Sequence, residues 1–360
     1  MKSQNKTIIL TIFSLQGGGA ERFVLTLAQG FKQLGYQPHI ICFKNQSDYC
    51  LPDDVPVHCL NYQAYRWIPK GLRYPIFAKV FDRFVKRHIA AEPALLLSNL
   101  WQVDQVLKYS RLPHRAFVIH NTQTQERQVH TELTDQALSR VYRGQHVVGV
   151  SRGVADDFAA LVSTTRSLTA IYNPIDQPAI IQQAQEPLDK ALTSGLAAGY
   201  LVHVGKFKGQ KNHRLLIQAY AKTQRNVPLV LVGQGKLQAE CEQLASELGI
   251  ADDVRFVGFH SNPYGWIAGA TGMVLSSDYE GFGLVIAEAL ALGVPVISTD
   301  CPSGPSELLP ADNLVPVGDV VKLSEKIQDL MDNPAAYRSA FDSQLLPDKV
   351  AQRYLDVVGK

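Results

Sequence analysis

The stretch GMVLSSDYEGFGLVIAEALALGVPVISTDCPSGPSELL, residues 272–309, constrains the fold of this chain more than any other. It begins with a short apolar run, turns through serine, glycine and acidic residues, and continues into an apolar helical pattern that ends at Leu292–Gly293. Pro295 and a second apolar run, Val296–Ser298, follow. This order predicts a βαβ unit, in which a right-handed crossover joins two parallel strands. We therefore expect an α/β fold with a parallel sheet.

Two carboxylates stand out in this stretch. The helix from Leu284 to Leu292 is apolar apart from Glu288, and a carboxylate in dry surroundings needs a partner. Glu280 precedes it in the loop at the carboxyl end of a strand, where open α/β sheets bind ligands. Between them, Gly281-Phe282-Gly283 can bring the first N–H groups of the helix against an anion. A nucleotide-sugar, with hydroxyls at both ends and phosphate in the middle, suits this arrangement.

A simpler interpretation of the same pair stays open. Glu280 can merely favour the helix dipole, and Glu288 can be an ordinary, partly exposed helix residue. The rest of the chain has to decide between the two.

The length and composition indicate a globular protein with more than one core. At 360 residues the chain is too long for one ordinary core, which predicts two domains. A content of 46% hydrophobic and 19% charged residues is typical of a globular protein and supplies enough apolar side chains for both cores. The formal net charge of +2 gives no general case for nucleic acid as a partner, so any basic function must be local.

The cysteines and the amino terminus predict the compartment. Neither a C-x-x-C pair nor a metal-ligand spacing occurs among the five cysteines, which are Cys42, Cys50, Cys59, Cys241 and Cys301. Such an odd, scattered set is typical of reduced thiols in a cytosol. The apolar run Thr7–Phe13 is too short to span a bilayer, and no cleavable signal precedes it. We expect a cytoplasmic protein, either soluble or peripheral on a membrane surface.

The first half begins like a nucleotide-binding half-sheet. Thr7–Phe13 predicts a buried strand, Gly17-Gly18-Gly19 a turn, and Glu21–Leu34 an amphipathic helix. The glycines do not match G-x-G-x-x-G, so they either let the backbone approach a phosphate or sugar or form only a tight turn. Further strands are expected at Gln37–Phe43, Val57–Leu60, Leu95–Ser98, Ala116–His120, His146–Val150 and Leu168–Tyr172.

His120 and Asn121 fall at the carboxyl end of one of these strands. A lone histidine in such a place is more often structural than functional. Its position on the ligand-binding edge of the sheet favours a functional role.

Residues 65–90, YRWIPKGLRYPIFAKVFDRFVKRHIA, carry aromatic and basic side chains at helical spacing. Apolar side chains after Pro75 form one face, and much of the remaining face is basic: Lys79, Arg83, Lys86 and Arg87. An ordinary surface helix packs such an aromatic stripe on a sheet. An interfacial helix instead lies on anionic lipid. The aromatic and basic residues just upstream, which the helix does not need, favour the membrane.

The second half repeats the architecture. The segment Gln177–Gly199 has no strong strand pattern, and we place the domain boundary there. Lys206 and Lys211 then flank a strand-to-helix turn, where lysines can neutralise a diphosphate, although most lysines are simply solvated. The segment Ser324–Val358 is helical in pattern. The strands of this half are expected at Tyr200–Val204, Leu229–Val232, Val254–Val257, Gly272–Leu275 and Val294–Ser298.

Together these motifs resemble the retaining glycosyltransferases of family GT4, which have the GT-B fold. The resemblance rests on G-G-G-A-E, H-N after a strand, V-G-K-x-x-x-x-K-N, V-G-Q-G and E-G-F-G-L-x-x-x-E-A-L-x-x-G-x-P-V-I, in the right order along nearly the whole chain. It implies two Rossmann-like domains with parallel sheets that face a central cleft. These would be an acceptor-side domain over residues 1–175 and a nucleotide-sugar-binding domain over residues 176–340. The last helix, over residues 341–360, could cross back to the first domain.

The resemblance also implies roles in the second domain. Glu288 would bind the ribose hydroxyls, and Glu280 would face the transferred sugar. The backbone of Phe282-Gly283-Leu284 would hold sugar hydroxyls and phosphate. Lys206 and Lys211 would clamp the diphosphate. Many relatives have arginine at the position of Lys206, so here the charge is kept but the bidentate fork is lost.

In the first domain, the resemblance implies that His120 reaches the donor sugar and that Gly18 and Gly19 meet the donor across the cleft. No D-x-D motif of the metal-dependent transferases stands in a matching position. Asp252-Asp253 and Asp156-Asp157 are better explained as a loop and a helix segment. We expect no cofactor and no essential metal.

The expected function is transfer of a sugar, of the hexosyltransferase type and with retention, from a nucleotide diphosphate donor. UDP is preferred to GDP on family frequency alone. The acceptor would be a glycan or lipid-linked glycan of lipopolysaccharide or another surface polysaccharide, reached at the inner face of the cytoplasmic membrane. The alternatives are a sugar-nucleotide epimerase or phosphorylase on the same architecture, and a nucleotide-sugar-binding protein without turnover.

Overall fold

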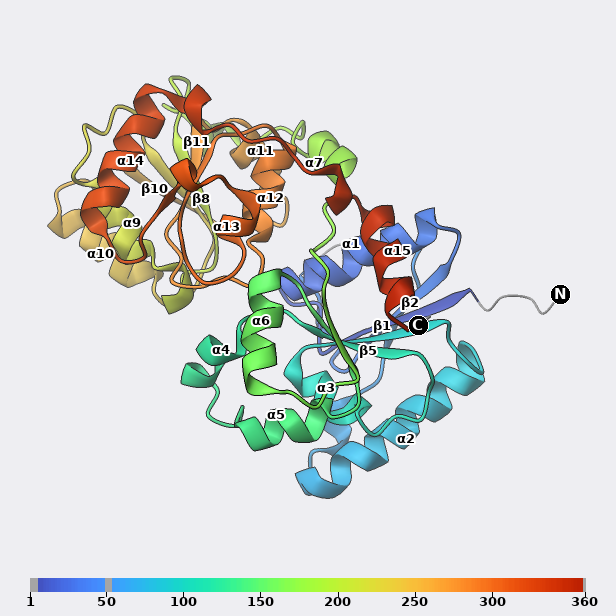
Figure 1. The fold of residues 1–360 in the computed structure, drawn as a ribbon. Coiled ribbons are helices and arrows are strands. Elements are labelled where there is room, and N and C mark those ends of the chain that lie inside the picture. The colour runs from blue at the N-terminus through green and yellow to red at the C-terminus, as the bar shows by residue number, and fades with distance from the viewer. Residues whose placement is uncertain (1–5, 49–53, 359–360) are drawn as a thin grey trace. The chain divides into compact units, whose positions relative to one another are not determined.

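The structure, a computed structural model, describes residues 6–48 and 54–358 and divides into two compact units. Unit 1 consists of Met1–Pro174 with Gln344–Lys360, and unit 2 consists of Ile175–Ser343. Each unit contains its own sheet (Figure 1). Four cysteines, Cys42, Cys59, Cys241 and Cys301, are free thiols, and Cys50 lies outside the described residues.

Unit 1 has a seven-stranded sheet in the order β3-β2-β1-β4-β5-β6-β7, and all its pairings are parallel. Its strands are β1 Thr7–Ile12, β2 Gln37–Cys42, β3 Val57–Cys59, β4 Leu95–Asn99, β5 Arg115–Ile119, β6 His146–Gly149 and β7 Ser167–Ala170. Its helices are α1 Gly19–Gln33, α2 Lys70–His88, α3 Trp101–Leu107, α4 Gln123–Val129, α5 Asp135–Tyr142, α6 Arg152–Leu161 and α15 Pro347–Val358, with a 3-10 turn η1 at Tyr62–Tyr65.

The centre of this sheet is buried because its strands are apolar along their whole length. Every residue of β1 and of β4 is buried. Such continuous apolar runs are typical of parallel strands that helices cover on both faces. Ile8 of β1 pairs with Pro38 on one side and with Leu95 on the other, so the chain continues in opposite directions from β1 and β4. Ligands bind at this kind of reversal in open α/β sheets.

Unit 2 has a six-stranded parallel sheet in the order β10-β9-β8-β11-β12-β13. Its strands are β8 Leu201–Val204, β9 Leu229–Val232, β10 Val254–Gly258, β11 Gly272–Leu275, β12 Val296–Thr299 and β13 Leu314–Val315. Its helices are α7 Gln177–Gln183, α8 Lys190–Thr193, α9 His213–Tyr220, α10 Gln238–Glu247, α11 Tyr264–Ala268, α12 Leu284–Ala291, α13 Pro305–Leu308 and α14 Val320–Asp332. Short 3-10 turns lie at η2 Gly209–Lys211, η3 Ala311–Asn313 and η4 Pro334–Tyr337, and η5 Ser343–Leu345 spans the boundary to the carboxyl-terminal part of unit 1.

Both sheets have the strand order of a Rossmann-like domain, in which the fourth strand lies beside the first. The predicted fold class, two parallel α/β domains, is therefore confirmed. The two-residue strand β13 was not predicted, because two residues show no periodicity. The helical pattern of residues 324–358 is interrupted: α14 ends at Asp332, and Pro334 follows, which cannot continue a helix.

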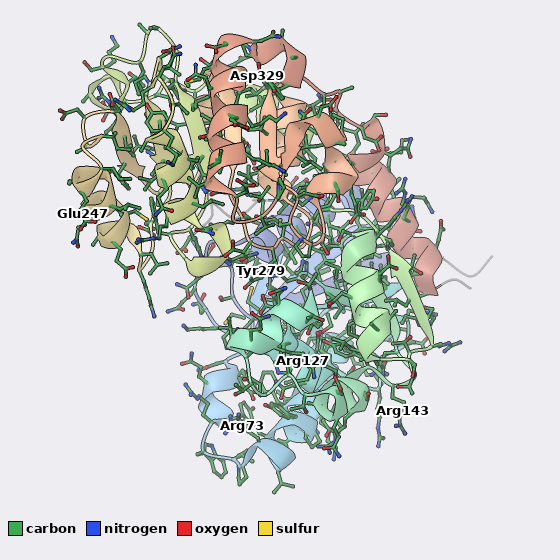
Figure 2. The ribbon with its side chains drawn as sticks, turned by 60° about the vertical axis from the view of Figure 1, so that its left-hand side comes forward. Arg73, Arg127, Arg143, Glu247, Tyr279 and Asp329 are labelled. Carbon is green, nitrogen blue, oxygen red and sulfur yellow. The ribbon has the colours of Figure 1, made fainter. Side chains whose placement is uncertain are left out.

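The helix α2 begins earlier than the sequence indicated. It starts at Lys70 and contains Pro75 in its interior. The expectation that the helix does not need the upstream residues is wrong in part. The ring of Tyr65 packs on Phe77 with 5.2 Å between centroids. The guanidinium of Arg73, which is labelled in Figure 2, donates to the carbonyl of Ile68 at 2.8 Å.

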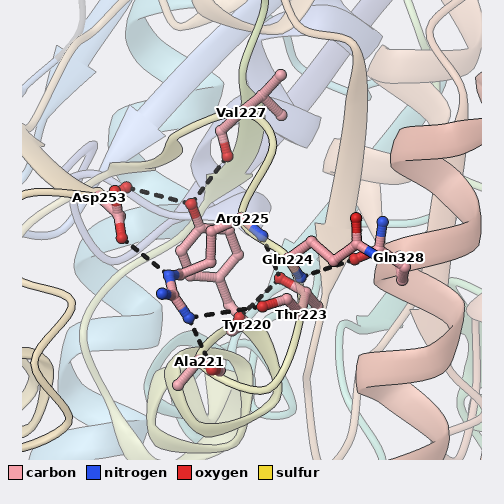
Figure 3. A network of polar contacts seen from close by, with 8 residues as sticks. All are labelled: Tyr220, Ala221, Thr223, Gln224, Arg225, Val227, Asp253 and Gln328. Atoms are coloured by element: carbon pink, nitrogen blue, oxygen red, sulfur yellow. Dashed lines mark hydrogen bonds and ion pairs between the residues drawn. The ribbon is translucent and has the colours of Figure 1, made fainter.

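Polar contacts join the segments at the amino-terminal edge of the unit 2 sheet (Figure 3). Arg225 Nε donates to Asp253 Oδ2 at 2.9 Å, and the Tyr220 hydroxyl donates to the Val227 carbonyl at 2.8 Å. Gln224 N donates to Gln328 Oε1 at 2.8 Å, which joins α14 to this edge. Asp253 directly precedes β10 and therefore lies at the edge opposite to the loop that contains Glu280.

The carboxyl-terminal helix α15 returns to unit 1 and packs against α1 (Figure 1). Tyr354 is fully buried, and its ring lies 5.9 Å from that of Phe23. The helices approach closely at Gly30, where an added Cβ would lie 2.1 Å from the backbone oxygen of Pro347.

Among the helices that the structure describes, none is both long and apolar enough to cross a membrane.

We predict that Gly30→Ala destabilises unit 1. The new methyl group would press on the Pro347 backbone, and overpacking of this kind costs about 1–3 kcal/mol. That loss should exceed the gain of about 1 kcal/mol from the higher helix propensity of alanine. Urea denaturation followed by circular dichroism measures the change. Gly71→Ala in α2, which has no neighbour within 4 Å of the added Cβ, is the matched control and should not lower stability. Equal stability of the two variants would contradict this account of the packing.

Candidate functional site

The strand order of unit 2 brings two predicted loops together. β8 and β11 are neighbours in the sheet, and the chain leaves them towards opposite sides. The loop after β8 contains Lys206 and Lys211, and the loop after β11 contains Glu280. Residues nearly 70 positions apart in the sequence thus meet at the carboxyl edge of the sheet.

Lys211 and Glu280 form a buried ion pair at this edge. Lys211 Nζ donates to Glu280 Oε1 at 2.5 Å, and the Ser277 hydroxyl donates to the same oxygen at 2.6 Å. Glu280 is only 6% exposed. Burial by itself raises the pKa of Glu280, but the Lys211 ammonium, these hydrogen bonds and the charge of Lys208 together lower it below its usual value. The carboxylate is therefore held in its charged form, so stability that depends on it is present above pH 4–5 and decreases as the pH falls further.

Glu288 is buried rather than partly exposed. It lies on α12, is 1% exposed, and its Oε1 accepts a hydrogen bond from the Tyr264 hydroxyl at 3.3 Å. Tyr264 belongs to α11, which packs against α12. This geometry contradicts the simpler interpretation of Glu288 as a partly solvated helix residue.

The segment between the two carboxylates leads into α12 at Gly283, close to the predicted start of the helix. Gly283 is the N-cap of α12 with φ of 84°, a left-handed conformation that favours glycine. Phe282 is buried, and the loop after β12 packs directly on it. An added Cβ on Gly304 would lie 2.4 Å from the Phe282 carbonyl oxygen. The first N–H groups of an α-helix have no carbonyl partner four residues earlier within the helix, and in α12 the Ile286 N–H already donates to the Gly283 carbonyl at 2.9 Å.

The V-G-Q-G motif, in the loop after β9, packs against the lysine loop, which is the loop after β8 that contains Lys206 and Lys211. An added Cβ on Gly233 would lie 2.0 Å from the Gly205 carbonyl oxygen, and one on Gly235 would lie 2.4 Å from that of Phe207. Both glycines therefore allow the loop after β9 to press against the loop after β8. Lys206 is exposed, whereas the Lys211 side chain is largely buried in its ion pair.

Sequence analysis missed two buried imidazoles beside Lys211. His203 on β8 is fully buried, and its Nδ1 donates to the Val274 carbonyl at 2.8 Å. The ring of His213 at the start of α9 lies 4.5 Å from that of His203. Burial lowers the pKa of His203 to about 4 and that of His213 to about 2, so both stay neutral and add no charge next to the Lys211 ammonium. A histidine in an apolar strand gives no signal by which this role could be predicted.

The predicted residues of unit 1 lie at the carboxyl edge of its own sheet. Gly18 is the N-cap of α1, in extended backbone, and an added Cβ there would lie 2.4 Å from Glu21 Oε2. His120 follows β5, and its ring packs edge-on against Phe23 of α1 at 4.9 Å. Gly19 is the first residue of α1, so this helix links the predicted glycines to the histidine.

Asn99, which the sequence did not single out, fixes His120 in one tautomer. Asn99 Nδ2 donates to the Thr11 carbonyl at 3.0 Å, so its Oδ1 faces His120 Nε2 at 2.8 Å and must accept from it. The hydrogen of the neutral ring is therefore on Nε2, and Nδ1 is left as an acceptor. Burial lowers the pKa of His120 to about 3.

The part of the chain that the structure describes contains no group of three or more His, Cys, Asp or Glu side chains that could hold a metal ion. Lysines and backbone amides are instead the cationic and hydrogen-bonding groups gathered at the edge of unit 2.

We predict that His120 takes up no proton between pH 5 and pH 8. Its folded-state pKa lies well below the value near 6.5 that an unfolded histidine has, because burial disfavours the imidazolium. Its contribution to stability is therefore lost as the pH falls below about 6.5. The ring nitrogen chemical shifts of histidine-labelled protein, assigned with His120→Gln, measure this titration. A midpoint near 6.5 in the folded protein would overturn the prediction, and urea-unfolded protein gives the reference.

Comparison with known proteins assigns each unit to a sequence family. The model of "Glycosyl transferases group 1" matches residues 185–344, and that of "Glycosyltransferase Family 4" matches residues 17–177. The two matches together span most of both units.

Individual relatives agree with these matches. An N-acetylgalactosamine-N,N'-diacetylbacillosaminyl-diphospho-undecaprenol 4-alpha-N-acetylgalactosaminyltransferase of Campylobacter jejuni is 28% identical over 84% of this chain and 82% of its own length. The lipopolysaccharide 1,6-galactosyltransferase of Salmonella typhimurium is 29% identical over 47% of this chain and 46% of its own. The crystal structure of Anabaena HepE in complex with UDP and glucose has the same fold, with a TM-score of 0.74, 18% identity and coverage of 98% of this chain and 95% of that one. The chain belongs to family 4 of the glycosyltransferases, the glycosyl transferases group 1, and has their GT-B fold.

Proposed function

We propose that this protein transfers a sugar from a UDP-sugar to a lipid-linked glycan acceptor, with retention at the anomeric carbon, in the assembly of lipopolysaccharide or another surface polysaccharide. One observation carries the proposal: the Lys211–Glu280 ion pair stands at the β8/β11 reversal of a sheet whose next helix holds the buried Glu288. The names of two relatives support the class of acceptor. The name of the Campylobacter jejuni transferase includes a diphospho-undecaprenol-linked sugar, and that of the Salmonella typhimurium transferase includes lipopolysaccharide. Solved structures of HepE with UDP and with UDP-glucose support the choice of donor.

In unit 2 the proposed roles follow the chemistry of the donor. A carboxylate such as Glu288 accepts from both hydroxyls of a ribose, and Glu280 accepts from hydroxyls of the transferred sugar. The Lys211 ammonium has three hydrogens, so the one donated to Glu280 leaves two for phosphate oxygens. Lys206 and the N–H groups at the start of α12, near Phe282-Gly283-Leu284, add to the stabilisation of the leaving diphosphate.

In unit 1 we propose that uncharged groups contact the donor. His120 offers an acceptor at Nδ1 to a hydroxyl of the donor sugar while Nε2 is held by Asn99. Gly18 and Gly19 leave room for the backbone to approach the donor. The charge that develops on the diphosphate is balanced by lysine and backbone groups, so we propose that the reaction needs no metal ion.

The first experiment tests donor binding. Nucleotide-sugars should raise the melting temperature, since a ligand that binds only the native state stabilises it. Glu288→Gln should weaken the donor affinity tenfold or more, because hydrogen bonds to a charged group contribute about 1.5–3 kcal/mol. Glu325→Gln on the exposed face of α14 is the matched control. Unchanged affinity in a folded Glu288→Gln protein would remove Glu288 from the site.

Turnover assays then separate the transferase from its alternatives. Lys206→Ala and Lys211→Ala should each reduce turnover more than stability, and EDTA should leave the wild-type rate unchanged. Loss of activity with EDTA and its return with magnesium or manganese would contradict the proposal that lysines, and not a metal ion, balance the charge of the diphosphate. Release of free nucleotide only with an acceptor favours a transferase over an epimerase or phosphorylase. Tight donor binding without product across a broad acceptor panel would instead support a binding protein.

The surface of α2 supports docking on anionic lipid at the inner face of the cytoplasmic membrane. Trp67 just before the helix is 83% exposed, and Leu72 and Ile76 are 61% and 38% exposed. Residues in a helix advance by about 100°, so Leu72 and Ile76 share one stripe of about 100° with four exposed basic residues. These are Lys79, Arg83, Lys86 and Arg87. The nearest acid on the helix, Asp82, turns away and accepts from the Ser110 hydroxyl at 2.5 Å.

We predict that replacing Lys79, Arg83, Lys86 and Arg87 with Gln abolishes binding to phosphatidylglycerol vesicles. Each cation near an anionic surface contributes about 1 kcal/mol, and salt screens the attraction. Co-sedimentation at low and high salt measures the binding. In the matched control, Gln replaces four exposed arginines elsewhere in unit 1, and this variant should still bind the vesicles. The four are Arg111, Arg140, Arg143 and Arg166. Equal partitioning of both variants, or no binding by the wild type, would leave α2 as an ordinary solvated helix.

A further inference from the structure

The lysine loop and the Glu280 loop of unit 2 are joined by more than their ion pair. Five hydrogen bonds connect residues 210–212 with residues 276–280. Besides the ion pair, the Ser276 hydroxyl donates to the Lys211 carbonyl at 2.9 Å, and Gln210 Nε2 donates to the Tyr279 carbonyl at 2.8 Å. Asp278 N donates back to the Gln210 carbonyl at 2.8 Å. These bonds therefore hold the backbones of the two loops next to each other on both sides of the ion pair.

The fifth bond comes from Asn212, which has three tasks at once. Its backbone is left-handed, with φ of 43° and ψ of 52°, a conformation that asparagine tolerates better than most residues. Its Oδ1 accepts from the Leu215 amide at 3.1 Å and so caps α9. Its Nδ2 donates to Asp278 Oδ1 at 2.8 Å. Aspartate cannot supply the donor, and glycine can supply neither bond, so of these three residues, which all tolerate a left-handed backbone, asparagine satisfies all three demands.

We propose that Asn212 and Asp278 are positioning residues that hold the Lys211 ammonium where it meets the diphosphate of the donor. Lys211 directly precedes Asn212, so the left-handed turn at Asn212 and its bond to Asp278 decide the direction in which the lysine leaves the backbone. Glu280 then fixes the end of the side chain at 2.5 Å. This inference rests on the proposed function, because it assigns the pair to the binding of that donor.

A purely structural role for Asn212, as the cap of α9, makes a different prediction. Loss of a helix cap lowers stability wherever the cap lies, but it does not act through Lys211. A positioning role loses its effect once Lys211 is absent, because two residues that act through one contact are not additive.

The experiment compares UDP and UMP affinities, measured by calorimetry, in single and double variants. Asn212→Gly keeps the left-handed backbone and adds no charge. It should raise the Kd for UDP about tenfold, as Lys211→Ala does, and change the Kd for UMP much less. In the Lys211→Ala background, Asn212→Gly should cause no further loss beyond about twofold. Thr134→Gly removes the cap of α5 in unit 1 and is the matched control, with UDP affinity unchanged.

An exchange of the two partners provides the rescue. Asn212→Asp keeps the cap but places a second carboxylate against Asp278, so UDP affinity should fall. Combining it with Asp278→Asn restores one donor and one acceptor, with the net charge of the wild type, and should return the Kd to within about threefold of the wild-type value.

The outcomes distinguish a failure of this inference from a failure of the proposed function on which it rests. Additive effects of Asn212→Gly and Lys211→Ala would overturn the positioning role, and so would a folded exchange variant that fails to recover UDP binding. In both cases the donor site would stand. Wild-type protein that binds no UDP, GDP or pyrophosphate would overturn the proposed function and this inference together.

Discussion

The site of unit 2 depends on one interaction, the buried ion pair between Lys211 and Glu280. A carboxylate that is 6% exposed is costly unless it is paired and hydrogen-bonded, and here Lys211 and Ser277 both donate to it. The pair exists only because β8 and β11 are neighbours, so that two loops distant in sequence meet. A buried ion pair contributes little net stability compared with apolar packing. Its presence at the edge where open α/β sheets bind ligands therefore fits the proposed role in donor binding better than a role in stability.

The two units differ in the kind of polar group that they present. The edge of unit 2 gathers charge, with Lys211 and Glu280 paired and Lys206 exposed. The edge of unit 1 offers a histidine that burial keeps neutral and that Asn99 locks in one tautomer. In the proposed reaction this division is reasonable, because the diphosphate is anionic and the sugar is not.

Tight backbone contacts explain both glycines of the V-G-Q-G motif and a third glycine in the loop after β12. The V-G-Q-G loop presses on the loop after β8 at Gly233 and Gly235, and Gly304 presses on the carbonyl of Phe282. These contacts leave no room for a Cβ and bring the backbones of four loops, those after β8, β9, β11 and β12, together in two close pairs. The motifs therefore encode the shape of the edge as much as the groups that line it.

The sequence by itself determined the local features: the parallel α/β units, most strands to within two residues, and Glu280 and Glu288 on either side of a helix start. Hydrophobic periodicity and glycine positions report such features because they depend on neighbours along the chain. Only the tertiary structure decided that Lys211 pairs with Glu280, that Asn99 orients His120, and that Asn212 bonds to Asp278. Each of these joins segments that the order of strands and helices brings together, and that order leaves no periodic signal in the sequence.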